Sequence, residues 1–185
     1  SVLGEELPDR TGRSPFRWIL DPIDGTKSFI HGVPLFGTLV GMEFEEQPVV
    51  GVIRIPATDE SVYAARGGGA WYVQGDAPPR PARVSSCERL AEGVFLSSEI
   101  KLWWDMGRED VFRRLQSAAR LVRTWGDCYG YMLVATGRAE LMVDPQMAVW
   151  DAAPLLPILE EAGGTFTDWQ GKPTIRGGDG IGTNG

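Results

Sequence analysis

Residues 18–26 read Trp-Ile-Leu-Asp-Pro-Ile-Asp-Gly-Thr, and the rest of the chain is organised around them. Phe16–Leu20 is a short apolar run that predicts a buried strand. Pro22 fixes φ and donates no hydrogen bond, so we expect the strand to end and the chain to turn there. Asp21 and Asp24 would then sit at the carboxyl end of the strand, beside the Ile23 carbonyl and the free amides of Gly25 and Thr26.

This turn predicts a site for a metal ion and a phosphate group. Carboxylate and carbonyl oxygens are hard ligands that select Mg²⁺, Mn²⁺ or Ca²⁺ over metals that prefer thiolates. Free amides where a helix starts suit phosphate, and Thr26 can cap a following segment, Lys27–Ile30. Metal and phosphate in one turn indicate phosphoryl chemistry, although the same residues would also suit an ordinary strand followed by an acidic turn.

The motif Asp21-Pro-Ile-Asp-Gly-Thr26 resembles the first signature of the inositol monophosphatase superfamily, the Mg²⁺-dependent phosphomonoesterases. A second stretch, Trp150-Asp-Ala-Ala-Pro-Leu-Leu-Pro-Ile-Leu-Glu-Glu-Ala-Gly-Gly164, resembles the second signature, whose aspartate is a metal ligand. From the residues alone, Asp151 is expected to cap a helix and Pro157 to kink it. The resemblance adds that Asp151 holds a metal.

Gly4-Glu5-Glu6 contains two further carboxylates. A pair of glutamates is common on solvated surfaces, but beside the aspartate motif it offers the third carboxylate that a multi-metal site requires. The resemblance places Glu5 on a metal and gives Glu6 the task of orienting water.

The resemblance also implies a complete ligand set. One Mg²⁺ would be held by Glu5, Asp21 and the carbonyl of Ile23, and a second by Asp21, Asp24 and Asp151, with two or three ions per active site and Mn²⁺ as an alternative. Gly25 and Thr26 amides would bind phosphate oxygens. The Thr26 hydroxyl would orient the attacking water, paired in the family with an aspartate that precedes Gly4-Glu5-Glu6 and is not in this sequence.

Two later tracts bear on the substrate. Arg123–Tyr131 and Ala135–Pro145 resemble the bacterial histidinol-phosphatase branch of the superfamily more than the enzymes for inositol. L-Histidinol phosphate carries an ammonium and an imidazole, and extra carboxylates favour such a ligand. We therefore expect Asp127 and Asp144 to contact its organic part, although Asp127 could equally serve only as a helix cap.

Several functions compete. The leading one is Mg²⁺-dependent hydrolysis of L-histidinol phosphate in histidine biosynthesis. An inositol-1-monophosphatase or a sugar phosphatase of broad specificity is the alternative enzyme. A catalytically inactive metal-binding homologue is the alternative outside the enzymes.

Composition narrows the setting. The chain has 185 residues, is 43% hydrophobic and 23% charged, and carries a net charge of −7. This composition is that of a globular domain. The negative net charge disfavours nucleic acid or an anionic membrane as partner. No apolar run approaches the roughly 20 residues that span a bilayer, and no signal-peptide pattern precedes Ser1. Cys87 and Cys128 make no disulfide framework, which indicates a reducing, cytoplasmic location.

Strand-like runs with hairpin turns and a helical pattern near residues 110–121 indicate a mixed α/β fold in one domain, residues 1–185. The resemblance implies a layered αβαβα sandwich and a homodimer. It also implies a helical segment before the first residue and a strand and helix after the last, so we expect the sequence to be part of a longer chain.

Overall fold

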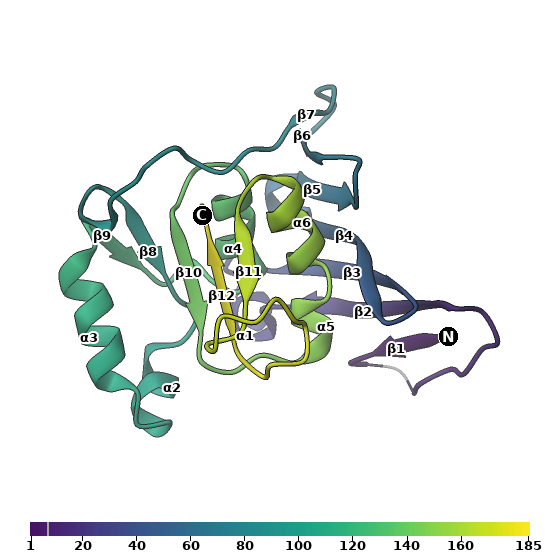
Figure 1. Ribbon diagram of the computed structural model, residues 1–185, viewed down its shortest axis with the longest axis horizontal. Coiled ribbons are helices and arrows are strands. Elements are labelled where there is room, and N and C mark those ends of the chain that lie inside the picture. Colours follow the sequence, from purple (N-terminus) through teal and green to yellow (C-terminus); the bar gives the residue numbers. More distant parts are fainter. Residues whose placement is uncertain (7) are drawn as a thin grey trace.

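The computed structural model describes residues 1–6 and 8–185, which form two β-sheets with helices between and beside them (Figure 1). The larger sheet has seven strands in sequence order, with β1 parallel to β2 and every later pair antiparallel. Its strands are β1 (Val2–Gly4), β2 (Phe16–Asp24), β3 (Gly37–Phe44), β4 (Gln47–Ile55), β5 (Glu60–Ala65), β6 (Ala70–Gln74) and β7 (Arg80–Pro81).

The smaller sheet has five strands in the order β11-β12-β10-β8-β9. Since β8, β9 and β10 run parallel and β12 runs antiparallel between β10 and β11, the sheet is mixed. Its strands are β8 (Val94–Leu96), β9 (Leu121–Arg123), β10 (Leu141–Asp144), β11 (Thr165–Thr167) and β12 (Gly180–Thr183).

The helices form two layers. Those between the sheets are α4 (Cys128–Ala135), α5 (Val149–Ala152) and α6 (Leu155–Glu161), and those beyond the smaller sheet are α2 (Ile100–Asp105) and α3 (Glu109–Ala118) (Figure 1). Single turns η1 (Pro56–Thr58) and η2 (Leu90–Glu92) and the short α1 (Thr26–Ile30) complete the elements. Sheet, helices, sheet and helices alternate, which confirms the mixed α/β class and accounts for four of the five layers of the predicted sandwich.

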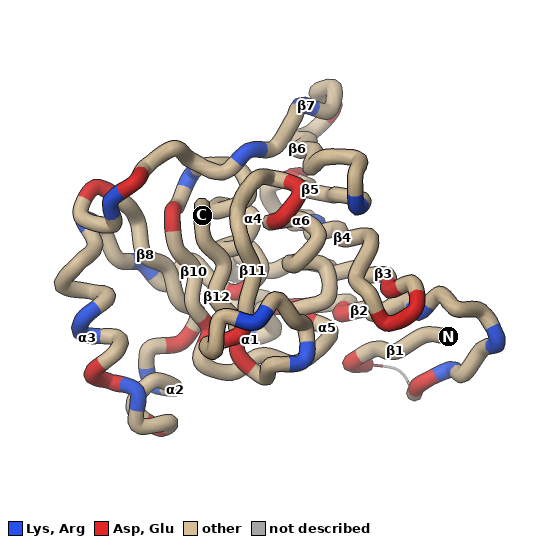
Figure 2. Tube along the Cα trace, in the orientation of Figure 1, with Lys and Arg blue, Asp and Glu red and all other residues tan. Residues whose placement is uncertain are grey.

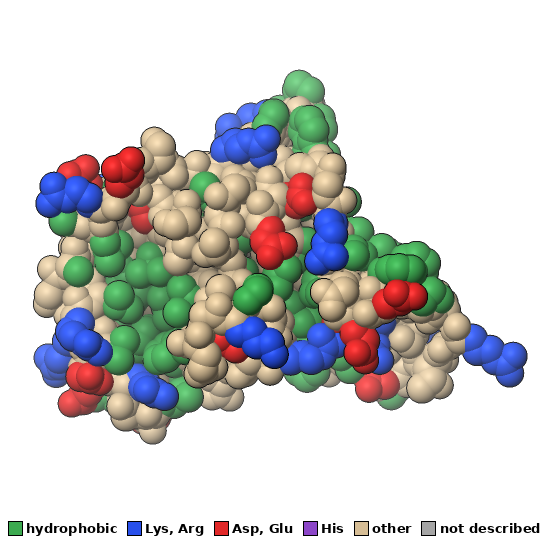
Figure 3. Space-filling model, viewed as in Figure 1, with side chains coloured by type: hydrophobic (Ala, Val, Ile, Leu, Met, Phe, Trp, Pro, Cys, Tyr) green, Lys and Arg blue, Asp and Glu red, His purple; other side chains and the backbone are tan. Residues whose placement is uncertain are grey.

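The outer face of the larger sheet carries apolar side chains. Val52, Tyr63 and Trp71 line a shallow hollow there, and Trp18 is 44% exposed on the same sheet. Figure 3, which views the molecule from the side of α6, also shows apolar side chains exposed near the β3 and β4 end of the larger sheet.

One hydrophobic cluster joins the two sheets. It includes Ile19 and Ile53 from the larger sheet, Leu96 from the smaller one, and Leu133 and Leu159 from the helices between them. A second cluster lies under α2 and α3. The first cluster spans both sheets and the helices between them, which agrees with the prediction of one domain.

The sequence-based boundaries needed two corrections. Pro22 does not end its strand: β2 continues to Asp24, because the pairing with β3 shifts between Asp21 and Asp24 and leaves Pro22 where no ladder donor is needed. Pro157 does not kink a helix, because α6 starts at Leu155 and places it in the first turn. The break falls instead between α5 and α6, at Ala153–Pro154.

Two glycines of the larger sheet allow the segment between α5 and α6 to pack directly against the sheet. Gly41 and Gly51 face each other across β3 and β4. A Cβ at Gly51 would lie 2.2 Å from the Pro154 carbonyl oxygen, and one at Gly41 would lie 2.6 Å from the Ala153 Cβ. The close approach seats α5, and with it Asp151, against β2.

Gly51→Ala is therefore expected to destabilise the protein by about 1–3 kcal/mol, the usual cost of overpacking. Gly41→Ala should cost less, because the shortest approach of its new methyl group is 2.6 Å, to the Ala153 Cβ, against 2.2 Å to the Pro154 carbonyl oxygen for Gly51. Urea denaturation of the two variants measures both values. Negligible losses in both variants would show that the α5–α6 break can move away from the sheet freely.

Among the described residues, no helix has the length and apolar character required to cross a membrane.

Candidate active site

Asp21 and Asp24 reach the same side of β2 because the strand is irregular. In a regular strand, residues three apart point to opposite faces. Here the register with β3 shifts between these two residues, and an irregularity of this kind re-aims side chains. Both carboxyl groups are buried, with Asp21 1% and Asp24 8% exposed.

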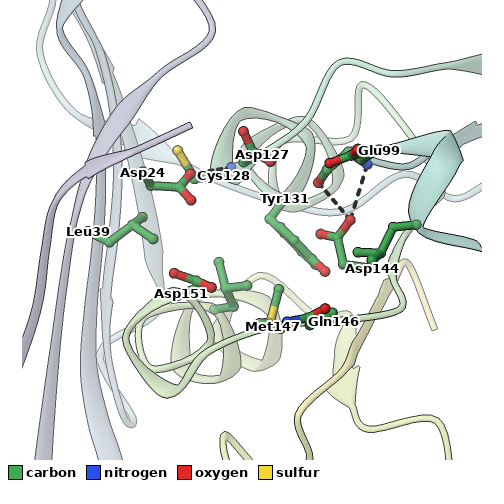
Figure 4. A pocket seen from close by; sticks show the side chains of 13 residues that line it. Asp24, Leu39, Glu99, Asp127, Cys128, Tyr131, Asp144, Gln146, Met147 and Asp151 are labelled. Carbon is green, nitrogen blue, oxygen red and sulfur yellow. Dashed lines mark hydrogen bonds between the residues drawn. The ribbon is translucent and has the colours of Figure 1, made fainter. Parts of the chain in front are cut away.

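Asp151 approaches from α5, on the other side of the cleft (Figure 4). It lies in the first turn of α5, where its Oδ2 accepts a hydrogen bond of 2.9 Å from the Ala148 amide. The predicted cap position belongs to Ala148, so Asp151 acts on the helix start from three residues further on. One carboxylate oxygen from each of Asp21, Asp24 and Asp151 lies within 4.8 Å of the others. Asp24 and Asp151, which are 127 positions apart in the sequence, thus lie side by side in the fold.

Glu5 borders this group of carboxylates. β1 runs parallel to β2 with Gly4 opposite Leu20, and the Glu5 amide donates to the Leu20 carbonyl at 3.3 Å. Glu5, the residue after β1, therefore lies next to Asp21, and both line the same cleft. Glu6, in contrast, lines a separate hollow together with Pro8 and Arg10, so its role in orienting water stays a prediction.

Burial and mutual repulsion raise the pKa of all three aspartates. For Asp21 the pKa rises to about 7, chiefly through burial and further through the charges of Glu5 and Asp151, against the lowering effect of the Ile23 amide. Burial raises the pKa of Asp151 to about 6 and that of Asp24 well above its usual range. The ionised forms of these carboxylates are unfavourable because they are buried and close together. A divalent cation bound between them would stabilise the ionised forms.

The motif residues that follow complete one wall. Gly25 has φ +77°, and a Cβ there would lie 3.0 Å from Asp127 Oδ2 and 3.1 Å from the Leu35 carbonyl oxygen. Only glycine suits such a position. The Thr26 hydroxyl donates to the Ile23 carbonyl at 3.1 Å, and Gly25 and Thr26 both line the cleft. Figure 2 shows acidic positions gathered around α1 and α5, where β2 ends.

The cleft, about 530 Å³ in volume, continues into an inner pocket of about 120 Å³ between α4 and β10. Asp144 lies on the far side of this pocket from Asp24 and Asp151, beside Tyr131 (Figure 4). Its Oδ1 accepts hydrogen bonds from the Ser98 amide at 3.1 Å and the Ser98 hydroxyl at 2.6 Å. Burial raises the pKa of Asp144 to about 6 in spite of these donors.

Asp127 lines both the cleft and the inner pocket. It precedes α4, but its side chain makes no capping hydrogen bond, so the cap that the sequence allowed is not formed. Burial raises the pKa of Asp127, while the Ser98 hydrogen bond and the Lys27 charge lower it. The next residue, Cys128, donates its amide to Asp24 at 2.7 Å and so joins the two aspartates.

Three residues of the cleft wall carry no signature in the sequence: Lys27, Ser98 and Glu99. Ser98 and Glu99 lie two and three residues after the end of the buried strand β8 at Leu96, and a polar stretch so close to a strand end is a weak sign of a site wall. Their partners come from distant parts of the chain, and this pairing is visible only in the structure.

Comparison with known proteins points in one direction. The model of the inositol monophosphatase family matches residues 1–184. A histidinol-phosphatase from Chlorobaculum parvum is 43% identical over 180 residues, which cover 97% of this chain and 68% of that protein. A histidinol-phosphatase from Streptomyces coelicolor is 38% identical and is matched over 100% of this chain and 71% of its own.

Solved structures share the fold. The extragenic suppressor protein suhB from Bartonella henselae superposes with a TM-score of 0.90 at 32% identity, covering 99% of this chain and 70% of the other. An inositol monophosphatase from Zymomonas mobilis gives a TM-score of 0.84 at 30% identity, over 100% of this chain and 70% of its own. A fructose-1,6-bisphosphatase/inositol-1-monophosphatase from Aquifex aeolicus is 34% identical in sequence over 90% of this chain and 62% of its own.

Proposed function

Because the chain belongs to the inositol monophosphatase family, we propose that it is a Mg²⁺-dependent phosphomonoesterase that converts L-histidinol phosphate to L-histidinol and phosphate. The observation that carries the proposal is the convergence of Asp21, Asp24 and Asp151 within 4.8 Å, at the mouth of a pocket lined by Asp127 and Asp144. The names of the similar proteins from Chlorobaculum and Streptomyces support this substrate.

The carboxylates fit a divalent cation, and the family is metal-dependent. Asp21, Asp24 and Asp151 would hold one Mg²⁺, while Glu5, Asp21 and the Ile23 carbonyl would hold another, with Asp21 shared. All of these groups supply oxygen, as Mg²⁺ prefers, and none supplies sulfur or imidazole. Two or three ions remain the proposed number, with Mn²⁺ as a substitute.

Bound Mg²⁺ would supply a water of lowered pKa and neutralise charge on the phosphoryl group and on the leaving oxygen. The protein's own residues would position the reactants. Gly25 and Thr26 would donate amides to phosphate oxygens, since both line the cleft beside the carboxylates. The Thr26 hydroxyl, now 3.1 Å from the Ile23 carbonyl oxygen, would orient the attacking water. No covalent nucleophile is required.

The pocket chemistry favours a cationic alcohol. Asp127 and Asp144 would bind the ammonium and imidazole of the substrate. The positive charge of the substrate would offset the unfavourable burial of these two carboxylates. A neutral polyol such as inositol would leave both charges uncompensated. The alternatives remain an inositol-1-monophosphatase or a broad sugar phosphatase, which the Aquifex relative's name supports, and a metal-binding homologue without activity.

Phosphate release from L-histidinol phosphate, inositol-1-phosphate and a sugar phosphate tests the proposal in one panel. We expect kcat/KM for the histidinol ester to exceed the others by at least about tenfold, the effect of one extra charge pair. Activity should vanish with EDTA and return with Mg²⁺. Equal or better hydrolysis of the inositol ester would refute the substrate. No release from any ester would favour the inactive homologue.

Two further properties are proposed with the function. A homodimer is expected from the family resemblance and would appear as twice the chain mass in light scattering. A cytoplasmic location is supported by the two free cysteines, Cys87 and Cys128, and cell fractionation would test it.

A further inference from the structure

An ion pair spans the mouth of the cleft. Lys27 Nζ, from α1, donates to a carboxylate oxygen of Glu99, which directly precedes α2 and lies 72 residues further along the chain. The Lys27 side chain is 80% exposed and that of Glu99 is 42% exposed. Exposed pairs of this kind contribute only about 0–1 kcal/mol, so a competing charge can replace either partner readily.

Glu99 stands where the two parts of the site meet. It lines both the open cleft with the metal-binding carboxylates and the inner pocket with Asp144. Its neighbour Ser98 holds Asp144 through two hydrogen bonds, which fixes the backbone on one side of Glu99. These bonds hold Asp144 in place, whereas the Glu99 side chain is 42% exposed and paired with Lys27.

Charge in this site is strongly one-sided. Among the residues that line the cleft and the pocket, Lys27 is the single basic one, and the acidic ones are Glu5, Asp21, Asp24, Glu99, Asp127, Asp144 and Asp151. The metal ions would compensate the carboxylates at the Asp21 end. Glu99 lies outside that group of three, and its counter-charge in the structure is Lys27.

We propose that Glu99 is a specificity-determining residue that binds the ammonium group of the substrate together with Asp127, which lines the same cleft and pocket, and that Lys27 occupies the Glu99 carboxylate until the substrate arrives. The inference rests on the proposed function and narrows its substrate class to phosphomonoesters of amino alcohols. The substrate ammonium replaces Lys27 at Glu99. Lys27, adjacent to Thr26, then remains near the phosphate and compensates part of its charge.

Two esters separate recognition of the amine from catalysis: L-histidinol phosphate and its analogue with a hydroxyl group in place of the amine. Glu99→Gln should lower kcat/KM for the amino ester about 10- to 100-fold, mainly through KM, because a charge-assisted contact is lost. The same variant should change the hydroxyl analogue less than about twofold. Glu92→Gln, an exposed glutamate in another ion pair, is the matched control and should change neither ester.

Lys27→Met distinguishes recognition from a purely structural link between α1 and α2. If the ion pair only held the cleft together, Lys27→Met and Glu99→Gln would affect both esters alike, and the inference would be wrong. Under the proposal, Lys27→Met keeps or increases the preference for the amino ester, since Glu99 is still present and no longer occupied. Equal loss on both esters in Glu99→Gln, or no loss, also overturns the inference, while wild-type protein that hydrolyses neither ester overturns the proposed function itself.

Discussion

Replacing Asp24 with asparagine is expected to lower Mg²⁺-dependent phosphate release at least about 100-fold, the loss that follows removal of even one preorganised charge-stabilising group. Asparagine keeps the shape and an oxygen that can accept the Cys128 amide, now 2.7 Å from Asp24 Oδ2. It removes the negative charge that a cation would bind. The fold should therefore persist while the activity is lost.

The metal-free Asp24→Asn protein should also be more stable than the wild type at pH 8. Asp24 is a buried carboxyl whose pKa is raised well above its usual range, and its ionisation in the folded state is unfavourable without a cation. Thermal melts in EDTA, together with circular dichroism, measure this. Asp76→Asn, an exposed aspartate in a loop, is the control and should alter neither rate nor stability. An Asp24→Asn protein with wild-type turnover would contradict the proposed metal site.

The metal-free protein is expected to lose stability as the pH rises from about 4 to 8, and Mg²⁺ should restore it. The pKa of Asp21 is raised to about 7 and those of Asp144 and Asp151 to about 6, whereas unfolded aspartate titrates near pH 3.9. The folded state thus binds more protons than the unfolded state in this range. This contribution to stability is fully present below about pH 4 and is lost as the pH passes through 6 and 7.

Mg²⁺ competes with these protons, so its stabilising effect should grow with pH. At about 100 times its dissociation constant, a ligand adds about 2.7 kcal/mol, which corresponds to roughly 5–10 °C in melting temperature for a chain of this size. We expect that shift at pH 8 and little of it at pH 5. Asp151→Asn should reduce both the pH dependence and the Mg²⁺ effect. Equal stabilisation at pH 5 and pH 8 would show that the cation binds away from these carboxylates.

The sequence supplied the residue types of the proposed site, because short-range chemistry decides them, and their binding of metal and phosphate stays a prediction. Two aspartates and a glycine at the end of an apolar strand indicate hard ligands beside a tight turn in any fold. Asp151 was ambiguous, since an aspartate at a helix start is usually only a cap. Asp127 had the same ambiguity, and its side chain caps nothing in the structure.

The errors came from local rules that tertiary packing overrides. Pro22 was expected to end its strand, but the shifted pairing with β3 accommodates it. Pro157 was expected to kink a helix, but the contact of Ala153 and Pro154 with Gly41 and Gly51 moved the break upstream. Both outcomes depend on which neighbour the segment meets.

By itself, the sequence determined the family, the mixed α/β class and the kinds of atoms available to a metal and a phosphate. Only the tertiary structure decided that Asp21 and Asp24 share one face of β2, that Asp151 meets them, and that Lys27 pairs with Glu99. The physical reason is that residue type and spacing set local chemistry, whereas distances between carboxylates far apart in the chain are set by sheet register and helix packing, which many segments determine together.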